Sequence, residues 1–154
     1  MWKTRPDPVI AGGRTSAAGL LAVAIMVLAG CSDPTPDEEI IRGHLDYMAE
    51  ALEEQNARRF MEPLAEDFTA TTRDLDRRAA RLLLRREMVA RERIRARTSG
   101  LEIQFHGEDR ATARFRAVLT GGSGIIPDDG RRYRVETGWR RAGGDWELIS
   151  AEWE

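Results

Sequence analysis

The stretch Tyr133–Trp153, "YRVETGWRRAGGDWELISAEW", decides the fold class of this protein. Every second residue of its first half is apolar or weakly polar, a period of two that predicts a β-strand with one buried face: Tyr133, Val135, Thr137 and Trp139. The following "AGGD" is typical of a turn between antiparallel strands, so "WELISAEW" is expected to form the partner strand. The end of the chain is therefore predicted to be a β-hairpin.

The same alternation continues toward the N-terminus and predicts two more long strands. In the first, Arg93–His106, inward positions fall at Ile94, Ala96, Thr98, Leu101, Ile103 and Phe105. Gly107–Asp109 is expected to form a turn. In the second strand, which follows this turn, the inward positions are Ala111, Ala113, Phe115, Ala117 and Leu119. The glycine-rich "GGSGIIPDDG" (121–130) is expected to connect this strand to the terminal hairpin. The sequence thus predicts four long antiparallel strands.

Helical periodicity dominates the region before these strands. Thr35 is expected to cap a helix that begins at Pro36 and runs to about Gln55, and Asn56 a shorter one that ends before Pro63. "DFTATT" (67–72) predicts a short strand. A third helix is predicted over Asp74–Glu92 and is expected to pack most heavily on the sheet. Its apolar stripe, which includes Arg86, contains Leu75, Ala79, Leu82, Leu83, Val89 and Ala90.

Helices followed by antiparallel strands indicate an α+β fold. "FMEPLAEDFTATT" (60–72) and the terminal stretch 133–153 resemble the nuclear transport factor 2-like (NTF2-like) superfamily, also described as SnoaL-like. The resemblance implies a cone in which three N-terminal helices pack on a curved, mainly antiparallel β-sheet. It places an NTF2-like domain at residues 37–154, and it implies a possible homodimer through the sheet.

The N-terminal region carries the features of a secretory signal. Three basic residues precede the uncharged run Ala17–Ala29, which is shorter than the roughly 20 residues of a membrane-spanning helix. The motif Leu28-Ala29-Gly30-Cys31 resembles the bacterial lipobox and ends in the only cysteine of the chain. This resemblance implies a signal peptide at 1–30, lipid on Cys31 and a short linker at 31–36. The alternative is a buried free thiol.

The lipobox resemblance places the domain in the cell envelope, anchored in the membrane through lipid on Cys31 and facing the periplasm. Ser32 favours the outer over the inner membrane in a Gram-negative bacterium. Removing Lys3, Arg5, Arg14 and Asp7 with the signal peptide leaves 21 arginines and 25 acidic residues. This balance, formally −4, gives no argument for nucleic acid as a partner.

Aromatic residues and Arg86 are expected to line the interior of the cone as a ligand pocket: Tyr47, Phe60, Phe68, Arg86, Phe115, Tyr133 and Trp139. A buried Arg86 would either pair with a carboxylate of the sheet or form the floor of a pocket for an acidic ligand. His44 and His106, the only histidines, are expected to be a partly buried helix residue and a solvent-facing strand residue. Neither a metal site nor a cofactor is expected.

The sequence does not contain the complete catalytic constellation of ketosteroid isomerase. The resemblance places the base of ketosteroid isomerase near Thr72, which cannot transfer a proton, and its oxyanion tyrosine near Tyr47. Asp67 and Asp74 are the remaining carboxylates for a base in an apolar pocket. We therefore expect a non-catalytic binding module for a small apolar or acidic ligand or for an envelope protein. The alternatives are a SnoaL-like or ketosteroid-isomerase-like enzyme and a purely structural envelope module.

One charged segment has two interpretations. Residues 73–97 contain ten arginines and four acidic residues. They could form a solvated face that pairs with Glu50, Glu53 and Glu54 of the first helix. They could instead contact anionic lipid headgroups, where each basic group contributes about 1 kcal/mol.

Overall fold

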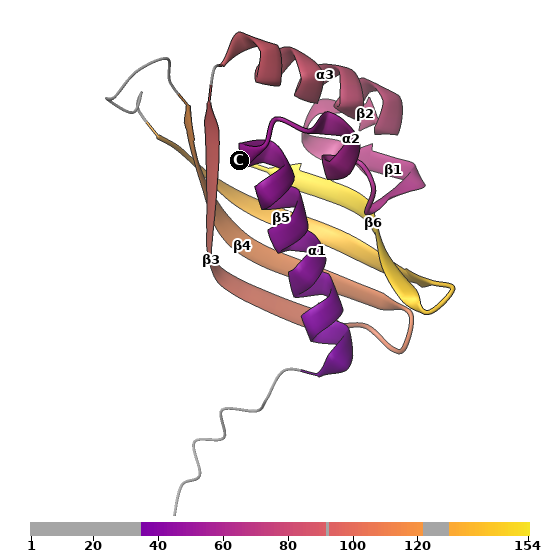
Figure 1. The fold of residues 1–154 in the computed structure, drawn as a ribbon. Coiled ribbons are helices and arrows are strands. Elements are labelled where there is room, and N and C mark those ends of the chain that lie inside the picture. The colour runs from indigo at the N-terminus through magenta and orange to yellow at the C-terminus, as the bar shows by residue number, and fades with distance from the viewer. Residues whose placement is uncertain (1–34, 92, 122–129) are drawn as a thin grey trace, which may run out of the picture. The chain divides into compact units, whose positions relative to one another are not determined.

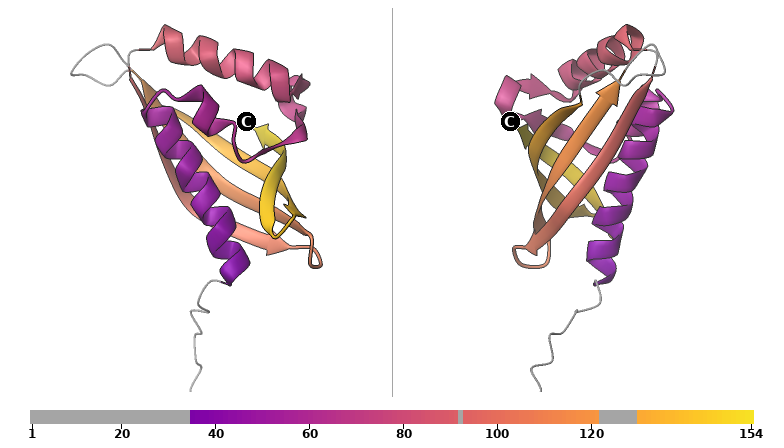
Figure 2. Two further views of the ribbon diagram at one scale, coloured as in Figure 1. Left: turned by 45° about the vertical axis from the view of Figure 1, so that its right-hand side comes forward. Right: turned by 90° about the vertical axis from the view of Figure 1, so that its left-hand side faces the viewer.

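The computed structural model describes residues 35–91, 93–121 and 130–154. The predicted signal peptide, Cys31 and most of the loop at 121–130 lie outside the described residues. Figure 1 shows helices on one face of a sheet, and Figure 2 shows that the described residues place no helix on the opposite face. The α+β architecture predicted from the sequence is confirmed.

Helix α1 spans Pro36–Glu53, and helix α2 spans Ala57–Phe60. Both begin at the predicted capping residues. The Thr35 hydroxyl accepts a hydrogen bond from the Glu38 N–H at 3.2 Å, and the Asn56 side chain accepts one from the Arg59 N–H at 3.1 Å. The break between the helices follows Gln55, whose positive φ of 55° cannot continue a helix.

The sheet has the order β2-β1-β6-β5-β4-β3. Its long strands are antiparallel neighbours, as predicted: β3 (Ile94–Phe105), β4 (Arg110–Gly121), β5 (Arg131–Ala142) and β6 (Asp145–Trp153). Strand β1 (Leu64–Ala70) pairs in parallel with β6 and antiparallel with the short β2 (Leu75–Asp76). The sheet thereby joins the segment between the helices to the end of the chain.

The segment between β1 and helix α3 differs from its prediction. Strand β1 begins three residues earlier than expected, and Thr71–Arg73 form a 3-10 turn, η1. Asp74 adopts a left-handed conformation with a φ of 51°, so a helix cannot begin there. Helix α3 (Arg77–Ala90) starts after Asp76, whose carboxylate accepts a hydrogen bond from the Ala79 N–H at 2.7 Å.

The predicted buried face of the third helix is wrong at Leu82, Arg86, Val89 and Ala90, which are exposed, whereas Leu75 packs against the core. The buried side of α3 instead follows a four-residue spacing through Ala80, Leu84 and Met88. Leu82 and Val89 are 59% and 89% exposed, and Arg86 is also exposed. The cause is the position of α3, which packs on β1, β2 and α2, whereas α1 packs on β3 and β6 (Figure 2). The helix that lies along the sheet is therefore α1 and not, as expected, α3.

The core lies between α1 and the inner face of the sheet. It contains the predicted α1 residues Ile41, Leu45 and Met48, together with the inward residues of β4, β5 and β6: Ala111, Ala113, Trp139, Trp146 and Leu148. Thr137 is the one buried polar side chain among the described residues. Its hydroxyl donates to the Ala113 carbonyl at 3.2 Å and accepts from Trp139 Nε1–H at 2.9 Å. The alternation of the long strands thus predicts the core correctly.

Candidate functional site

The predicted cone-lining residues do not gather around one cavity. Phe68 and Trp139 are buried in the core, and Phe60 and Phe115 pack against it half-buried. Phe115 also lines a small cavity of about 150 Å³ between α1 and β3. The other members of the predicted pocket are half-buried or exposed: Tyr47, Tyr133 and Arg86. Arg86 on the solvent side of α3 cannot form the floor of an interior pocket, so that expectation is corrected.

Asp67 has the wrong environment for a general base. It is exposed, and the Arg140 guanidinium donates to both of its carboxylate oxygens at 2.8 and 2.9 Å. These hydrogen bonds lower the pKa of Asp67. A base that works near neutral pH needs a raised pKa, which burial in an apolar pocket supplies. Asp74 is also exposed, on the left-handed turn after η1. Neither carboxylate lies in an apolar interior.

Tyr47 takes part in a surface network at the junction of α1 and α2. Its hydroxyl donates to the Glu62 carboxylate, a bond that raises the pKa of Tyr47. The Arg59 guanidinium lies 4.3 Å from the centre of the Tyr47 ring and pairs with Glu50 at 2.9 Å and also with Glu54. Two of the acidic residues expected to pair with the 73–97 segment, Glu50 and Glu54, therefore pair with Arg59 of α2. Tyr47 holds the two helices together.

The histidines occupy the predicted kinds of position. His44 is half-buried on α1, where its ring stacks on Trp139 with centroids 5.9 Å apart and its Nε2 lies 2.9 Å from Asp145. This contact lowers the pKa of Asp145. His106 is exposed, with Nε2 3.0 Å from the Thr112 hydroxyl. Within residues 35–91, 93–121 and 130–154, no group of three or more His, Cys, Asp or Glu side chains is arranged to hold a metal ion.

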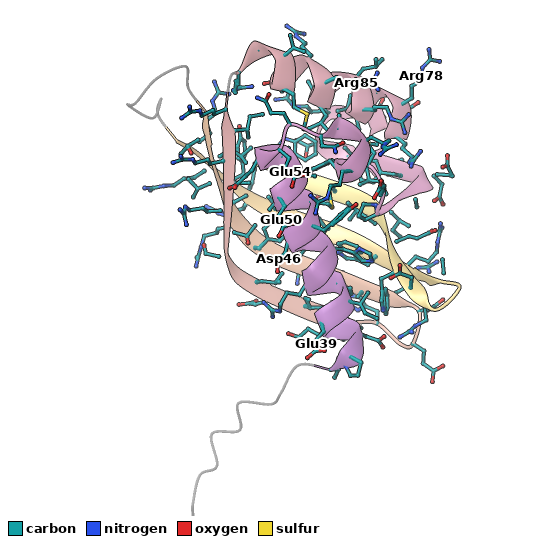
Figure 3. The ribbon with its side chains drawn as sticks, viewed as in Figure 1. Glu39, Asp46, Glu50, Glu54, Arg78 and Arg85 are labelled. Carbon is teal, nitrogen blue, oxygen red and sulfur yellow. The ribbon has the colours of Figure 1, made fainter. Side chains whose placement is uncertain are left out.

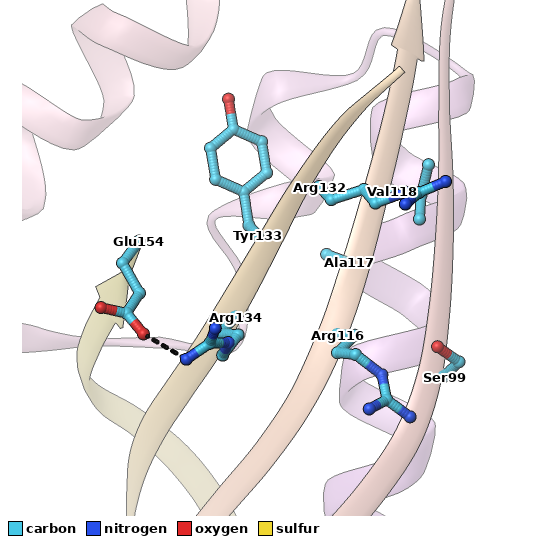
Figure 4. Close-up of a pocket in the computed structure, with 8 residues that line it drawn as sticks. All are labelled: Ser99, Arg116, Ala117, Val118, Arg132, Tyr133, Arg134 and Glu154. Atoms are coloured by element: carbon cyan, nitrogen blue, oxygen red, sulfur yellow. Dashed lines mark hydrogen bonds and ion pairs between the residues drawn. The ribbon is translucent and has the colours of Figure 1, made fainter.

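A groove lies at the end of β3, β4 and β5. It is lined by the outward residues Ser99, Arg116, Val118, Arg132 and Arg134, and also by Ala117, Tyr133 and Glu154. It has a volume of about 690 Å³. The strand register aligns Arg97, Val118 and Arg132 in one row and Ser99, Arg116 and Arg134 in the next. Figure 4 shows Arg132 extending across β4 beside Val118, and Arg116 extending toward Ser99. Arg134 pairs with Glu154 at 3.1 Å. Three arginines, Arg116, Arg132 and Arg134, therefore line this groove, and Arg97 lies opposite Val118 on β3.

This groove is not predicted from the sequence. The residues that alternate with the core positions of β4 and β5 carry no predicted role. The available signal was arginine at successive outward positions, as in "ARFR" (113–116) and "RRYR" (131–134). That signal becomes a cluster only when the strand register is known.

A second basic surface lies on α3. Its exposed arginines are Arg78, Arg81, Arg85 and Arg86, which surround Leu82 and Val89. Figure 3 shows Arg78 and Arg85 extending from α3, on a different part of the domain from the acidic side chains labelled on α1. None of the helices in the described ranges has the length and apolarity that crossing a membrane requires.

No protein-family model matches the chain, and no curated protein matches its sequence. Solved structures with similar folds do exist. A protein of unknown function with a cystatin-like fold from Nostoc punctiforme has a TM-score of 0.65 and 16% identity, over 80% of this chain and 94% of its own. An NTF2-like protein from Novosphingobium aromaticivorans has a TM-score of 0.65 and 20% identity, over 76% and 80%.

A candidate dehydratase of the NTF2-like family from Streptomyces avermitilis has a TM-score of 0.66 and 14% identity, over 79% of this chain and 97% of its own. At these identities, the likenesses bear on the fold alone. The α+β arrangement of residues 35–154, with its six-stranded and mostly antiparallel sheet, is the fold of NTF2-like proteins, which is also described as cystatin-like.

Proposed function

We propose that this protein is a lipid-anchored, extracytoplasmic NTF2-like domain that acts by binding a ligand or an envelope protein and not by catalysis. The observation that carries the proposal is an apolar core without a buried carboxylate among the described residues. Trp139, Trp146 and Leu148 are at most 2% exposed and pack with α1 in one apolar core. Thr137 is the one buried polar residue among those described, so this core holds no buried carboxylate that could act as a base.

The electrostatics of the carboxylates support the same proposal. Each described Asp or Glu with a perturbed pKa has a lowered pKa, because an arginine, histidine or tryptophan donates a hydrogen bond to it: Asp37, Asp67, Glu87 and Asp145. Such groups stay ionised and are weak bases at neutral pH. They are arranged to stabilise surface contacts.

The enzyme alternative draws on the dehydratase description of the Streptomyces avermitilis protein. An enzyme of this kind would need a carboxylate in an apolar site. We expect NMR titration of the side-chain carboxyl groups of the full chain to show none that ionises above about pH 6, well above the usual range for carboxyls. A carboxyl that titrates near pH 7 would contradict the proposal and favour an enzyme.

The lipid anchor rests on the lipobox resemblance at Cys31 and lies outside the described residues. Two or three acyl chains would hold the domain stably on a bilayer. We expect cells supplied with labelled palmitate to label the wild-type protein and not the Cys31→Ser variant. We also expect the label to fractionate with the outer membrane, because Ser32 follows the cysteine. An unlabelled wild-type protein of full-length mass would refute the anchor.

Binding is tested on protein extracted from its native membrane. Native mass spectrometry of the gently extracted wild-type protein is expected to show an added mass, from a small ligand or a partner, that disappears on unfolding. Persistent absence of any added mass, together with failure of chemical crosslinking to capture a neighbour, would favour the purely structural alternative.

A further inference from the structure

On the outward face of the sheet, charged side chains of both signs lie near the middle, and arginines predominate toward one end of the strands. At the middle of the sheet, Arg114 lies between Glu102 and Glu136, and its Nε donates to Glu136 at 2.6 Å. The two rows nearer the end contain Arg97, Arg132, Arg116 and Arg134, with Glu154 as the one acidic residue lining the groove. Mixed charge thus gives way to a cluster of positive charge.

This cluster carries an electrostatic cost in the free protein. Side chains opposite or diagonal to each other on neighbouring strands are about 4.5–8 Å apart at Cβ, and like charges at such positions repel. Only Arg134 has an ion-pair partner, Glu154, among the described residues; Arg97, Arg116 and Arg132 have none there. A bound anion would remove this repulsion, so the cluster is suited to binding one.

The Arg116 guanidinium lies close to the backbone of β3 at Gly100. The strand has an irregularity between Ser99 and Glu102, where Gly100 adopts a positive φ of 64°. A Cβ atom on Gly100 would lie 2.9 Å from Arg116 Nη2. The guanidinium therefore rests over the glycine backbone, in space that any other residue would fill. The Ser99 hydroxyl next to it adds a neutral donor, and Figure 4 shows both lining the same groove.

We propose that this arginine groove, lined by Ser99, Arg116, Arg132 and Arg134, binds a small ligand that carries a phosphate group. A guanidinium offers a planar fork of N–H donors that matches phosphate oxygens, and several such forks favour a multiply charged group. The groove volume of about 690 Å³ is in the range of small-molecule sites. The inference deepens the proposed binding function and rests on it. The phosphate could belong to a free solute or to a phospholipid headgroup.

Calorimetric titration of the full chain with inorganic pyrophosphate at low salt tests the site. The double variant Arg116→Gln/Arg132→Gln is expected to bind at least about tenfold more weakly, because each charge-assisted hydrogen bond contributes about 1.5–3 kcal/mol. The matched control, Arg78→Gln/Arg85→Gln, removes the same charge from α3, and its affinity is expected to change less than about twofold. Both pairs are exposed, so the fold should tolerate the changes.

A third variant separates geometry from charge. Gly100→Ala keeps every arginine but displaces the Arg116 guanidinium, so pyrophosphate binding should weaken at constant net charge. Its far-ultraviolet circular dichroism and melting temperature establish that the fold is retained. If Gly100→Ala unfolds, the comparison of Arg116→Gln/Arg132→Gln with the α3 control variant decides whether the groove binds pyrophosphate.

Two results overturn the proposal. Equal weakening in the α3 control would show attraction by bulk charge, and no measurable binding of pyrophosphate by the wild type would remove the site. In either case, a ligand or partner seen by native mass spectrometry would leave the broader binding function standing.

Sedimentation with vesicles separates the two sources of phosphate. Binding to phosphatidylglycerol vesicles but not to phosphatidylcholine vesicles, lost in Arg116→Gln/Arg132→Gln, supports a headgroup ligand in this groove. Vesicle binding that only the α3 variant loses assigns lipid contact to α3. Pyrophosphate binding lost with the groove arginines then supports a free phosphorylated solute.

Discussion

The buried hydroxyl of Thr137 offers the sharpest test of how the core is built. It connects Trp139 Nε1–H to the Ala113 carbonyl through hydrogen bonds of 2.9 and 3.2 Å. Thr137→Val keeps the branched shape but removes the acceptor, which leaves the indole N–H of a fully buried tryptophan without its partner. An unsatisfied buried donor costs about 1–3 kcal/mol. We expect Thr137→Val to reduce the free energy of unfolding by about 2 kcal/mol.

A double-mutant cycle isolates this contribution. Trp139→Phe removes the N–H donor together with part of the ring, and it destabilises the fold through lost packing. In that background Thr137→Val no longer orphans a donor, so its cost should fall by about 1 kcal/mol or more. Urea unfolding followed by far-ultraviolet circular dichroism measures all four free energies, without relying on tryptophan fluorescence.

The outcome of the cycle decides whether the hydrogen bond matters. If Thr137→Val costs the same in both backgrounds, within about 0.3 kcal/mol, then the two residues are not coupled and the reasoning is refuted. Thr137→Ser serves as the control, since it keeps the hydroxyl and loses one methyl group, at a cost of about 1 kcal/mol. A cost for Thr137→Ser above that of Thr137→Val would show that packing dominates.

Three further predictions follow from packing and charge. Gly138→Ala is expected to reduce the free energy of unfolding by about 1–3 kcal/mol, because the new Cβ would lie 2.4 Å from the Ser150 Oγ. Adding Ser150→Ala to this variant should restore most of the lost stability, as measured by chemical denaturation. Met88→Ala should reduce the free energy of unfolding by about 2–5 kcal/mol, whereas Val89→Ala should reduce it by less than about 0.5 kcal/mol. Similar melting temperatures for the two variants would contradict the orientation of α3. Acidification below about pH 4 should lower the free energy of unfolding. A carboxyl such as that of Asp67 has a lower pKa in the folded state than in the unfolded state, so the unfolded state binds protons first as the pH falls. In thermal melts between pH 2 and 5, Asp67→Asn should lose less stability on acidification than the wild type.

The ligand pocket expected around Arg86 was less predictable than the strands. Three consecutive leucines, Leu82 to Leu84, span about 200° of a helix, so periodicity alone could not tell which of them faces the core. The stripe predicted from the sequence placed Arg86 on the buried side of the helix. In the structure, α3 packs on β1 and α2, and Leu84 and Met88 lie on its buried side. Arg86 was accordingly placed in a pocket that the structure does not form around it.

The sequence by itself determined the elements that depend on neighbours in the chain: the caps at Thr35 and Asn56, and the inward faces of β3 to β5. A two-residue period or a capping side chain is a local property, and its energy is set within a few residues. The tertiary structure alone decided the parallel pairing of β1 with β6, the rotation of α3 and the alignment of Arg97, Arg116, Arg132 and Arg134 in two neighbouring rows of the sheet. These depend on which distant segments bury one another, because strand register brings together side chains that no local pattern connects.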